Sequence, residues 1–186
     1  GLPRKDMEWI FNTPRDTRPK QVFPLLAATQ PSTGFGEVFQ YNNLITTAGG
    51  FISGQVAHPG QEVGAAYDAA MKERVFAPLG MNDTTFSFDT ALAGNHASPH
   101  DLDPDGQAVT GHNDTAWSIV PYRPAGGAWS SAHDMARYAA LELTKGILPD
   151  GRRLVSEANL LERRNHRVST GQNRWYGMGL DRKSVV

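Results

Sequence analysis

The sequence predicts an α+β fold that is mainly helical and carries short antiparallel hairpins. Three observations predict it: apolar residues recur at helical spacing in long segments, capping residues flank those segments, and two Asp-Gly pairs separate short strand-like stretches. The 186 residues suffice for one domain with a core. No linker or repeat divides them, so residues 1–186 are expected to form a single domain.

The first part of the chain is expected to be irregular, with one tightly packed helix after it. Residues 1–24 carry four prolines and predict an extended loop with a short helix around 6–11. A second short helix is expected in 21–30. From 44 to 56 the chain is apolar and contains glycines, and its length and the polar residues before it favour a helix over a strand. Because glycine lowers helix propensity, we expect these glycines to pack closely against a neighbour.

The clearest helix is predicted over residues 64–81. Pro78 and Gly80 are expected to end it. One side of it is formed by small and branched residues at three- to four-residue spacing, namely Ala66, Ala69, Ala70 and Val75.

Another helix is predicted over residues 131–146. Ser131 with Asp134 three residues later is a capping-box pattern, and Gly146 is expected to end the helix. Ser156 is expected to cap a further short helix.

Two turns are predicted from Asp-Gly pairs. Residues 103–109 are expected to form a tight turn between two short strands, and residues 148–155 hold the second pair.

Composition excludes several function classes. The formal net charge is −1, which predicts neither nucleic acid nor a membrane surface as a partner. The absence of cysteine excludes disulfides, zinc thiolate sites and thiol nucleophiles. No apolar run approaches the length of about 18 residues that a spanning helix needs, so no membrane span is expected. No cofactor is predicted either.

A calcium site is the less favoured interpretation of one acidic segment. Asp101, Asp103 and Asp105 match the first half of a calcium loop, but the twelfth position holds His112 where a glutamate is needed. We therefore expect a hairpin turn here and predict no metal site.

Residues 39–44, "FQYNNL", put a phenol and two amides before an apolar helix. Asn42 or Asn43 is expected to be the helix cap, with Tyr41 packed nearby. Alternatively, Tyr41 is a general acid or base and Asn43 binds substrate. An ordinary phenol is a poor base at neutral pH, so that role needs cations beside it, and no lysine of this chain is obviously placed there.

No nucleophile motif is complete in this sequence. Ser-x-x-Lys, Gly-x-Ser-x-Gly and Lys-Thr-Gly are all absent. The sequence His58-Pro59-Gly60 fits a His-x-Gly pattern, but it stands between two predicted helices, so we interpret it as a connecting turn.

Five segments in order nevertheless resemble the serine β-lactamase-like hydrolases, a family that includes class C β-lactamases, D-alanyl-D-alanine carboxypeptidases and related esterases. The segments are "GLPRKDMEW", "FQYNNL", "FAPLGMNDTTF", "PAGGAWSSAHDMARY" and "WYGMGL". The resemblance covers nearly the whole chain. It implies the mainly helical region of the β-lactamase/transpeptidase-like fold, with most of the central sheet missing, and so an internal fragment of a longer protein.

The resemblance also implies site residues. Tyr41 and Asn43 match the family's Tyr-x-Asn element, which makes Tyr41 a catalytic acid/base and Asn43 a substrate-binding amide. Gly126 and Gly127 would bind substrate at the cleft rim, although a packing role is at least as well supported. Ser130 and Ser131 are expected to be caps rather than nucleophiles.

The function implied is that of a serine hydrolase that acylates and deacylates small-molecule or peptide substrates through an amide or ester. This chain alone would be inactive, because it lacks Ser-x-x-Lys. The alternative is a non-catalytic binding or assembly module with the same fold. A missing sheet would leave apolar surface exposed, so self-association or a partner that covers this surface is expected. The periplasm or cell surface is suggested by the resemblance alone.

Overall fold

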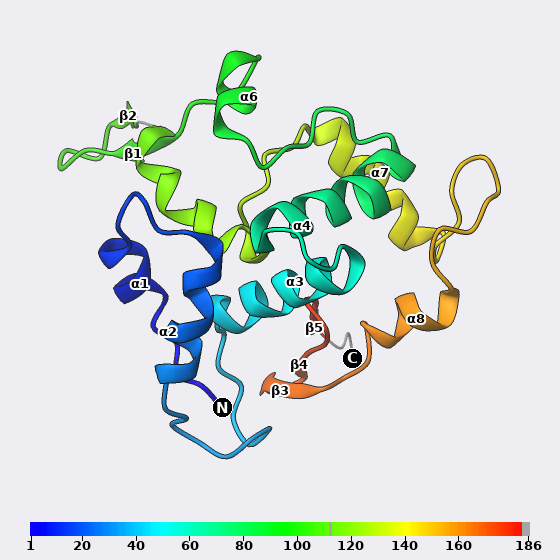
Figure 1. Ribbon diagram of the computed structural model, residues 1–186, viewed down its shortest axis with the longest axis horizontal. Coiled ribbons are helices and arrows are strands. Elements are labelled where there is room, and N and C mark those ends of the chain that lie inside the picture. The colour runs from blue at the N-terminus through cyan, green and yellow to red at the C-terminus, as the bar shows by residue number, and fades with distance from the viewer. Residues whose placement is uncertain (112, 184–186) are drawn as a thin grey trace.

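Helices dominate the computed structural model, which describes residues 1–111 and 113–183 (Figure 1). The α-helices are α1 (Asp6–Asn12), α2 (Val22–Ala28), α3 (Asn43–Ala57), α4 (Val63–Met71), α5 (Ala77–Leu79), α6 (Phe88–Ala93), α7 (Ala132–Leu143) and α8 (Glu157–Glu162). The other helical segments are the 3₁₀-helices η1 (Pro19–Gln21) and η3 (Asn113–Ala125) and the π-helix η2 (Lys72–Phe76). The strands are β1 (His100–Leu102), β2 (Ala108–Thr110), β3 (Val168–Gly171), β4 (Arg174–Tyr176) and β5 (Asp181–Lys183). The predicted α+β class is confirmed.

Helix α3 lies at the centre of the molecule and confirms the helix predicted over residues 44–56 (Figure 1). Two of its glycines lie where a neighbouring element comes very close. A Cβ added at Gly54 would lie 2.6 Å from the backbone nitrogen of Tyr67 in α4, and one at Gly50 would lie 2.4 Å from Cβ of Pro124. These contacts confirm the expected close packing. Gly49 is different, because open space surrounds its Cβ position.

The helix predicted over residues 64–81 is confirmed as three consecutive segments, α4, η2 and α5. Gly80 ends it in the left-handed conformation, at φ 66°, whereas Pro78, which was also expected to end it, lies within α5. The π-turn of η2 in its middle was not predicted, since an extra residue in one helical turn leaves no clear mark in the apolar spacing.

Two hydrophobic clusters form the core. The first joins α2, α3, α4 and η3 through Val22, Leu44, Phe51, Tyr67 and Tyr122. The second joins η2, α5 and α7 through Phe76, Leu79, Met81, Leu141 and Leu148. Met71 and Phe86 pack against both clusters, so apolar contacts run from one to the other.

Helix α7 begins at Ser131 as predicted, because the Ser131 hydroxyl accepts a hydrogen bond from the Asp134 N–H at 3.1 Å. The second half of the predicted capping box is wrong. The Asp134 carboxylate is buried and instead accepts the Asp83 N–H and the Thr84 hydroxyl, both at 2.8 Å. A buried carboxylate requires donors, and the loop before α6 supplies two.

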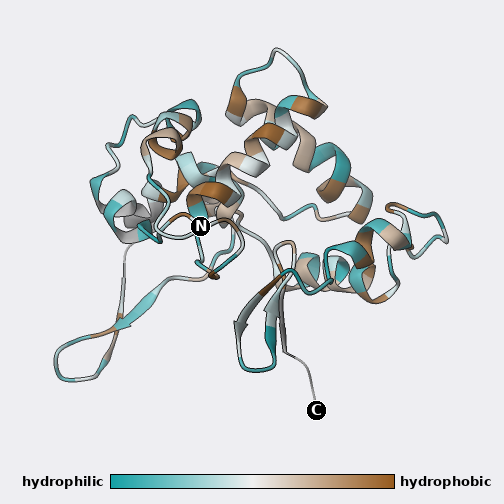
Figure 2. Ribbon diagram, turned by 90° about the horizontal axis from the view of Figure 1, so that it is seen from below, coloured by the Kyte–Doolittle hydropathy of each residue, from teal (hydrophilic) through white to brown (hydrophobic). Residues whose placement is uncertain are grey.

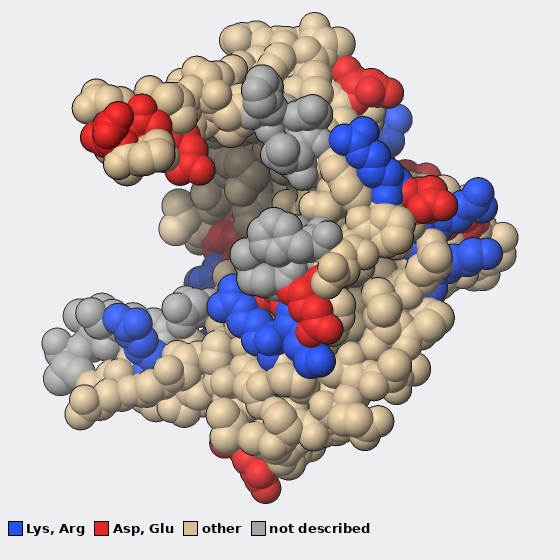
Figure 3. Space-filling model, turned by 90° about the vertical axis from the view of Figure 1, so that its left-hand side faces the viewer, with Lys and Arg blue, Asp and Glu red and all other residues tan. Residues whose placement is uncertain are grey.

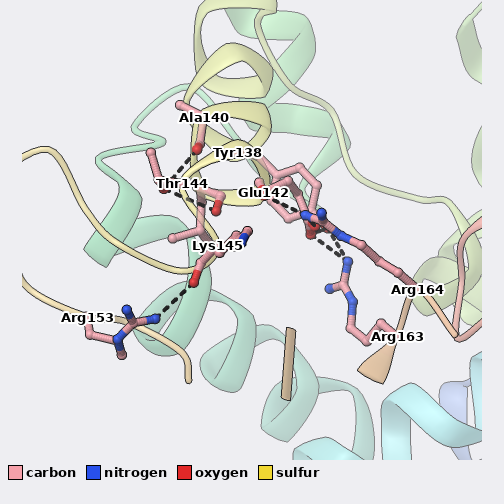
Figure 4. A network of polar contacts seen from close by, with 9 residues as sticks. Tyr138, Ala140, Glu142, Thr144, Lys145, Arg153, Arg163 and Arg164 are labelled. Atoms are coloured by element: carbon pink, nitrogen blue, oxygen red, sulfur yellow. Dashed lines mark hydrogen bonds and ion pairs between the residues drawn. The ribbon is translucent and has the colours of Figure 1, made fainter. Parts of the chain in front are cut away.

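An ion-pair network joins α7 to the end of α8 (Figure 4). The Glu142 carboxylate pairs with Arg163 and with Arg164, the latter at 2.9 Å, and accepts the Tyr138 hydroxyl at 3.0 Å. The Arg163 carbonyl in turn accepts the Met178 N–H at 3.0 Å. The network therefore reaches the turn between β4 and β5.

The segment considered for calcium is a hairpin, as favoured from the sequence. β1 and β2 pair antiparallel, and the Asp103 carboxylate accepts the backbone N–H groups of Asp105 and Gln107. This is an Asx turn, so Asp103 is used to hold the loop. His112 lies outside the described residues. Figure 2 shows this hairpin extending away from the helices.

The strands β3, β4 and β5 form an antiparallel sheet in sequence order. The rings of Phe39 and Tyr41, in the loop before α3, contact the Tyr176 ring of β4, with centroids 5.0 and 6.4 Å apart. The sheet thus lies beside the segment that carries the candidate site.

Candidate active site

Tyr41, Asn42 and Asn43 lie at the start of α3, where the side chains of the two asparagines make different contacts. Asn42 has extended backbone and its side-chain oxygen accepts the Ile45 N–H at 3.0 Å. Its side-chain nitrogen donates to the Pro3 carbonyl at 2.9 Å. Of the two asparagines predicted as possible caps, Asn42 is therefore the helix cap, and both ends of its amide are engaged.

Asn43 is half-buried and uses only its backbone to hold this region. Its N–H donates to the Asp6 carboxylate at 3.2 Å. Within residues 1–111 and 113–183, its side-chain amide has no hydrogen-bond partner. The hydrogen-bonding groups of the Asn43 carboxamide are thus unused within the described residues, and this side chain lines a cavity of only about 20 Å³.

Tyr41 has its ring held and its hydroxyl free. The Tyr176 ring meets the Tyr41 ring edge-on, at 90°, and the Arg4 guanidinium lies 5.4 Å from its centroid. The side chain is 41% exposed, and no described residue forms a hydrogen bond with its hydroxyl. The sequence offered no lysine for this position, and the cation that lies over the ring is the arginine 37 positions earlier in the chain.

Tyr41 borders a pocket of about 470 Å³ between the loop before α3 and the β3–β5 sheet. The lining side chains are Phe39, Tyr41, Thr170, Arg174, Tyr176 and Gly179. The Thr170 hydroxyl is buried without a hydrogen-bond partner, and Arg174 has no ion-pair partner in the described part of the chain. The Tyr41 phenol and the Arg174 guanidinium, which line one pocket, can hold a polar group of a bound molecule.

Thr170 and Arg174 were not predicted as site residues. The only signal near them is the segment "WYGMGL", which follows Arg174 directly and served only to support the resemblance. Their position depends on how β3 and β4 pack against Phe39 and Tyr41, a long-range contact that no local spacing encodes.

Gly126 and Gly127 end η3 and do not line the Tyr41 pocket. Both backbone N–H groups donate to the Arg123 carbonyl, at 3.2 and 2.9 Å. A Cβ at Gly127 would lie 2.5 Å from Cβ of Arg123, so close packing explains why a glycine stands there. Their role in substrate binding stays a prediction.

Ser130, Ser131 and the His-x-Gly sequence have structural roles. Ser131 caps α7, and the Ser130 hydroxyl lies 2.9 Å from that of Thr84. His58 ends α3, and Gly60 takes a left-handed conformation in the turn that follows. The expected connecting turn is therefore confirmed.

Larger cavities exist elsewhere, and in one of them the two oppositely charged side chains pair with each other. One of about 580 Å³ beside α4 and η2 is lined by Asp68 and Arg123, which pair through two bonds of 2.7 and 3.0 Å. Next to it, burial and the Asp68 charge raise the pKa of Tyr67 to about 12, although the Arg123 charge opposes this. Tyr67 thus stays neutral at physiological pH and is no proton carrier, so cavity size alone does not locate the site.

In residues 1–111 and 113–183, no three acidic or histidine side chains are grouped closely enough to bind a metal ion, and no helix could cross a membrane. On the face shown in Figure 3, basic and acidic side chains form small separate groups.

Comparison with known proteins identifies a matching family and a relative in sequence. The beta-lactamase family model matches residues 1–185. Penicillin-binding protein 4 of Amycolatopsis lactamdurans is 30% identical over 102 residues, which are 52% of this chain and 25% of that protein.

Two solved structures share the fold. The octameric penicillin-binding protein homologue from Pyrococcus abyssi matches 88% of this chain and 35% of its own, with a TM-score of 0.68 and 21% identity. The penicillin binding protein from Bacillus halodurans matches 100% of this chain and 53% of its own, with a TM-score of 0.69 and 21% identity. The chain spans only a quarter to about half of the proteins it resembles. Because the family model matches almost every residue, this chain belongs to the beta-lactamase family.

Proposed function

We propose that this chain is the Tyr-x-Asn part of a serine hydrolase of the β-lactamase and penicillin-binding type, which acylates and deacylates amide or ester substrates. Tyr41 is its acid/base, and Asn43 holds the substrate's amide or acyl group. The nucleophilic serine belongs to a longer gene product, because no Ser-x-x-Lys occurs in these 186 residues. Family membership and the similarity to a penicillin-binding protein support this proposal.

The proposal rests on the difference between Asn42, whose side-chain oxygen and nitrogen are both hydrogen-bonded, and its two neighbours at the start of α3. A helix cap alone requires one amide, and Asn42 supplies it with both side-chain atoms engaged. Tyr41 and Asn43 stand on either side of Asn42, and their side-chain polar groups have no hydrogen-bond partner within the described residues. Tyr41 lines the pocket beside the β3–β5 sheet, whereas Asn43 lines a separate, small cavity of about 20 Å³. Partly exposed polar groups without internal partners are the ones that a substrate can engage.

The reaction needs a proton carrier beside the serine. As the serine oxygen attacks the carbonyl carbon, its proton passes to a base, and the leaving amine or alcohol takes up a proton as its bond to that carbon breaks. Water then repeats the sequence on the acyl-enzyme. A phenol that faces the serine can carry the proton in each direction, with Asn43 orienting the substrate.

Acylation of the complete gene product tests the proposal. The protein is treated with a fluorescent penicillin or a fluorophosphonate, and the modified serine is located by mass spectrometry. We expect the adduct on a serine that precedes a lysine by three residues and lies outside residues 1–186, and no adduct after that serine is changed to alanine. An adduct on Ser130 or Ser131, or none on the folded protein, would overturn the hydrolase and favour a non-catalytic binding or assembly module.

A further inference from the structure

Asp6 joins the N-terminal segment to the residues of the candidate site. This carboxylate is only 4% exposed although it belongs to a short surface helix. One of its oxygens accepts the Asn43 N–H at 3.2 Å, and the other accepts Nε–H of Arg4 at 2.9 Å. A carboxylate at the first turn of α3 is favoured by the helix dipole, so Asp6 holds the start of α3 and the Arg4 side chain together.

Arg4 continues this connection to the phenol. Its guanidinium, held by Asp6, lies 5.4 Å from the centroid of the Tyr41 ring, within the range of a cation–π contact. The edge-on contact with Tyr176 bounds the same ring at 6.4 Å. Two groups from distant parts of the sequence thus limit how the ring can turn, while its hydroxyl is left without a partner among the described residues.

The same segment also engages the cap residue. The Pro3 carbonyl accepts the Asn42 side-chain N–H at 2.9 Å. Residues 3–6 therefore contact all three site residues: the Arg4 guanidinium contacts Tyr41, the Pro3 carbonyl contacts Asn42 and the Asp6 carboxylate contacts Asn43. The cap itself is the Asn42 side-chain oxygen that accepts the Ile45 N–H, so the Arg4 contact with the Tyr41 ring is not needed to cap the helix.

We propose that Arg4 and Asp6 are positioning residues that fix the Tyr41 ring and the Asn43 backbone in the orientation the reaction requires. The catalytic part of this inference rests on the proposed function. Neither residue needs to touch substrate: Asp6 acts through Arg4 and the Asn43 N–H, and Arg4 acts through the Tyr41 ring. A misplacement of about 1 Å at a reacting group can cost roughly a hundredfold in rate. Loss of the Arg4 or Asp6 contacts should therefore lower the rate measurably.

The first test measures the ring itself in this 186-residue chain. Arg4 is 63% exposed, so Arg4→Gln removes the charge with little risk to the fold. With ¹³C-labelled tyrosine rings, we expect the signals of Tyr41 and Tyr176 to shift in Arg4→Gln and in Asp6→Asn, with the other three of the five tyrosines unchanged. Tyr41 signals that stay in place in Arg4→Gln would overturn the proposal.

A matched control exists in the same chain. The Arg15 guanidinium lies 5.5 Å from the Trp117 ring, a cation–π contact of similar length that does not involve the site. Arg15→Gln should leave the Tyr41 signals where they are. A shift of equal size in Arg15→Gln would mean that the signals report general effects of losing a charge.

The second test measures turnover in the complete gene product, with active enzyme counted by acylation so that loss of folded protein does not enter the rate. We expect Arg4→Gln and Asp6→Asn to lower kcat about tenfold to a hundredfold with KM changed less than about twofold, and Arg4→Lys to recover part of the loss. An unchanged kcat, or an equal fall in Arg15→Gln, would refute the positioning role. If the wild type forms no acyl-enzyme, the proposed function fails, and the ring signals then decide only whether the two residues hold the phenol.

Discussion

At the start of α3, adjacent amides have opposite roles because of their backbone positions. Asn42 takes the extended conformation of a cap residue, so its oxygen meets an N–H three residues ahead. Asn43 is already helical, and its side chain is left without a partner in the described structure. The sequence predicted either residue as the cap, because asparagine is favoured at the N-cap position and the two asparagines are adjacent.

Stability measurements on Asn42→Ala and Asn43→Ala check this assignment. Asn42→Ala should lower the free energy of unfolding by about 1 kcal/mol, because it removes the cap. Asn43→Ala should change it by less than about 0.5 kcal/mol, since no side-chain hydrogen bond is lost. Urea denaturation followed by circular dichroism gives both values, and equal losses would contradict the assignment.

Tyr41→Phe removes the hydroxyl and keeps the ring in its contacts with Arg4 and Tyr176. In the complete gene product we expect turnover of a chromogenic ester or cephalosporin to fall about 10²- to 10⁴-fold, the usual size of an acid/base contribution. Stability should change little, because the hydroxyl has no partner in the residues the structure describes. Unchanged hydrolysis would remove Tyr41 from the mechanism.

At the scale of elements, α3 and α4 approach so closely that one position must be glycine. Gly54→Ala would bring a methyl group to 2.6 Å from the α4 backbone, which cannot move aside as a flexible side chain can. We expect a loss of about 1–3 kcal/mol in the free energy of unfolding. Gly49→Ala is the matched control in the same helix: it meets open space and should stabilise by up to about 1 kcal/mol through helix propensity. A tolerated Gly54→Ala in thermal denaturation would show that the helices lie further apart.

The contact between α7 and α8 makes stability depend on pH. Burial alone would raise the pKa of Glu142, but hydrogen bonds from Arg164 and Tyr138 and the charges of both arginines outweigh burial and hold this pKa below its ordinary value of 4.5. A carboxyl with a depressed pKa in the folded state stabilises the protein above its unfolded pKa, and this stabilisation is lost as pH falls through the folded pKa.

The wild type should therefore lose stability from about pH 4.5 downward, and Glu142→Gln should flatten that part of the profile while being less stable at pH 7. Urea midpoints measured from pH 7 to pH 3 give the profile. Glu157→Gln removes the exposed pair with Lys145 and serves as the control, whose effect should be weaker and reduced by salt. A profile unchanged by Glu142→Gln would assign the acid sensitivity to other carboxylates.

At the scale of the whole molecule, α3 turns an apolar stripe outward. Ile45, Ile52 and Val56 are 46, 55 and 77% exposed, and Gly49 lies between them in open space. Their spacing of four, three and four residues puts all four positions on one side of the helix, opposite the buried face that contains Leu44, Thr47, Ala48, Phe51 and Gly54. Exposed apolar surface of this kind favours association.

We expect the isolated chain to self-associate as its concentration rises. Ile52→Glu should weaken that association at least about tenfold, because it puts a charge in the centre of the stripe. Leu143→Glu, which changes an 83% exposed residue on α7, is the control and should have little effect. Sedimentation velocity over a range of concentrations measures both, and a clean monomer at high concentration would contradict the expectation.

The sequence by itself determined the longer helices, which are α3, α7 and the α4–η2–α5 segment, and the turn between β1 and β2, because these depend on residues a few positions apart. It did not predict α6, η3 or the strands β3 to β5. Gly80, Ser131, Ser156 and the Asp103–Asp105 turn act where they were predicted, since a hydrogen bond or a backbone angle within one turn decides them. Asn42 is one of the two caps that the sequence left open. The order of short motifs also carried the resemblance to the family.

Only the tertiary structure decided which polar groups meet across long stretches of chain. It brought Arg4 to the ring of Tyr41, Asp6 to the start of α3, and Thr170 with Arg174 to the same pocket as that ring. It also turned Asp134 from the predicted capping box toward the loop before α6. These contacts depend on how helices and strands pack, which follows from the whole set of buried surfaces, so no short window of sequence contains them.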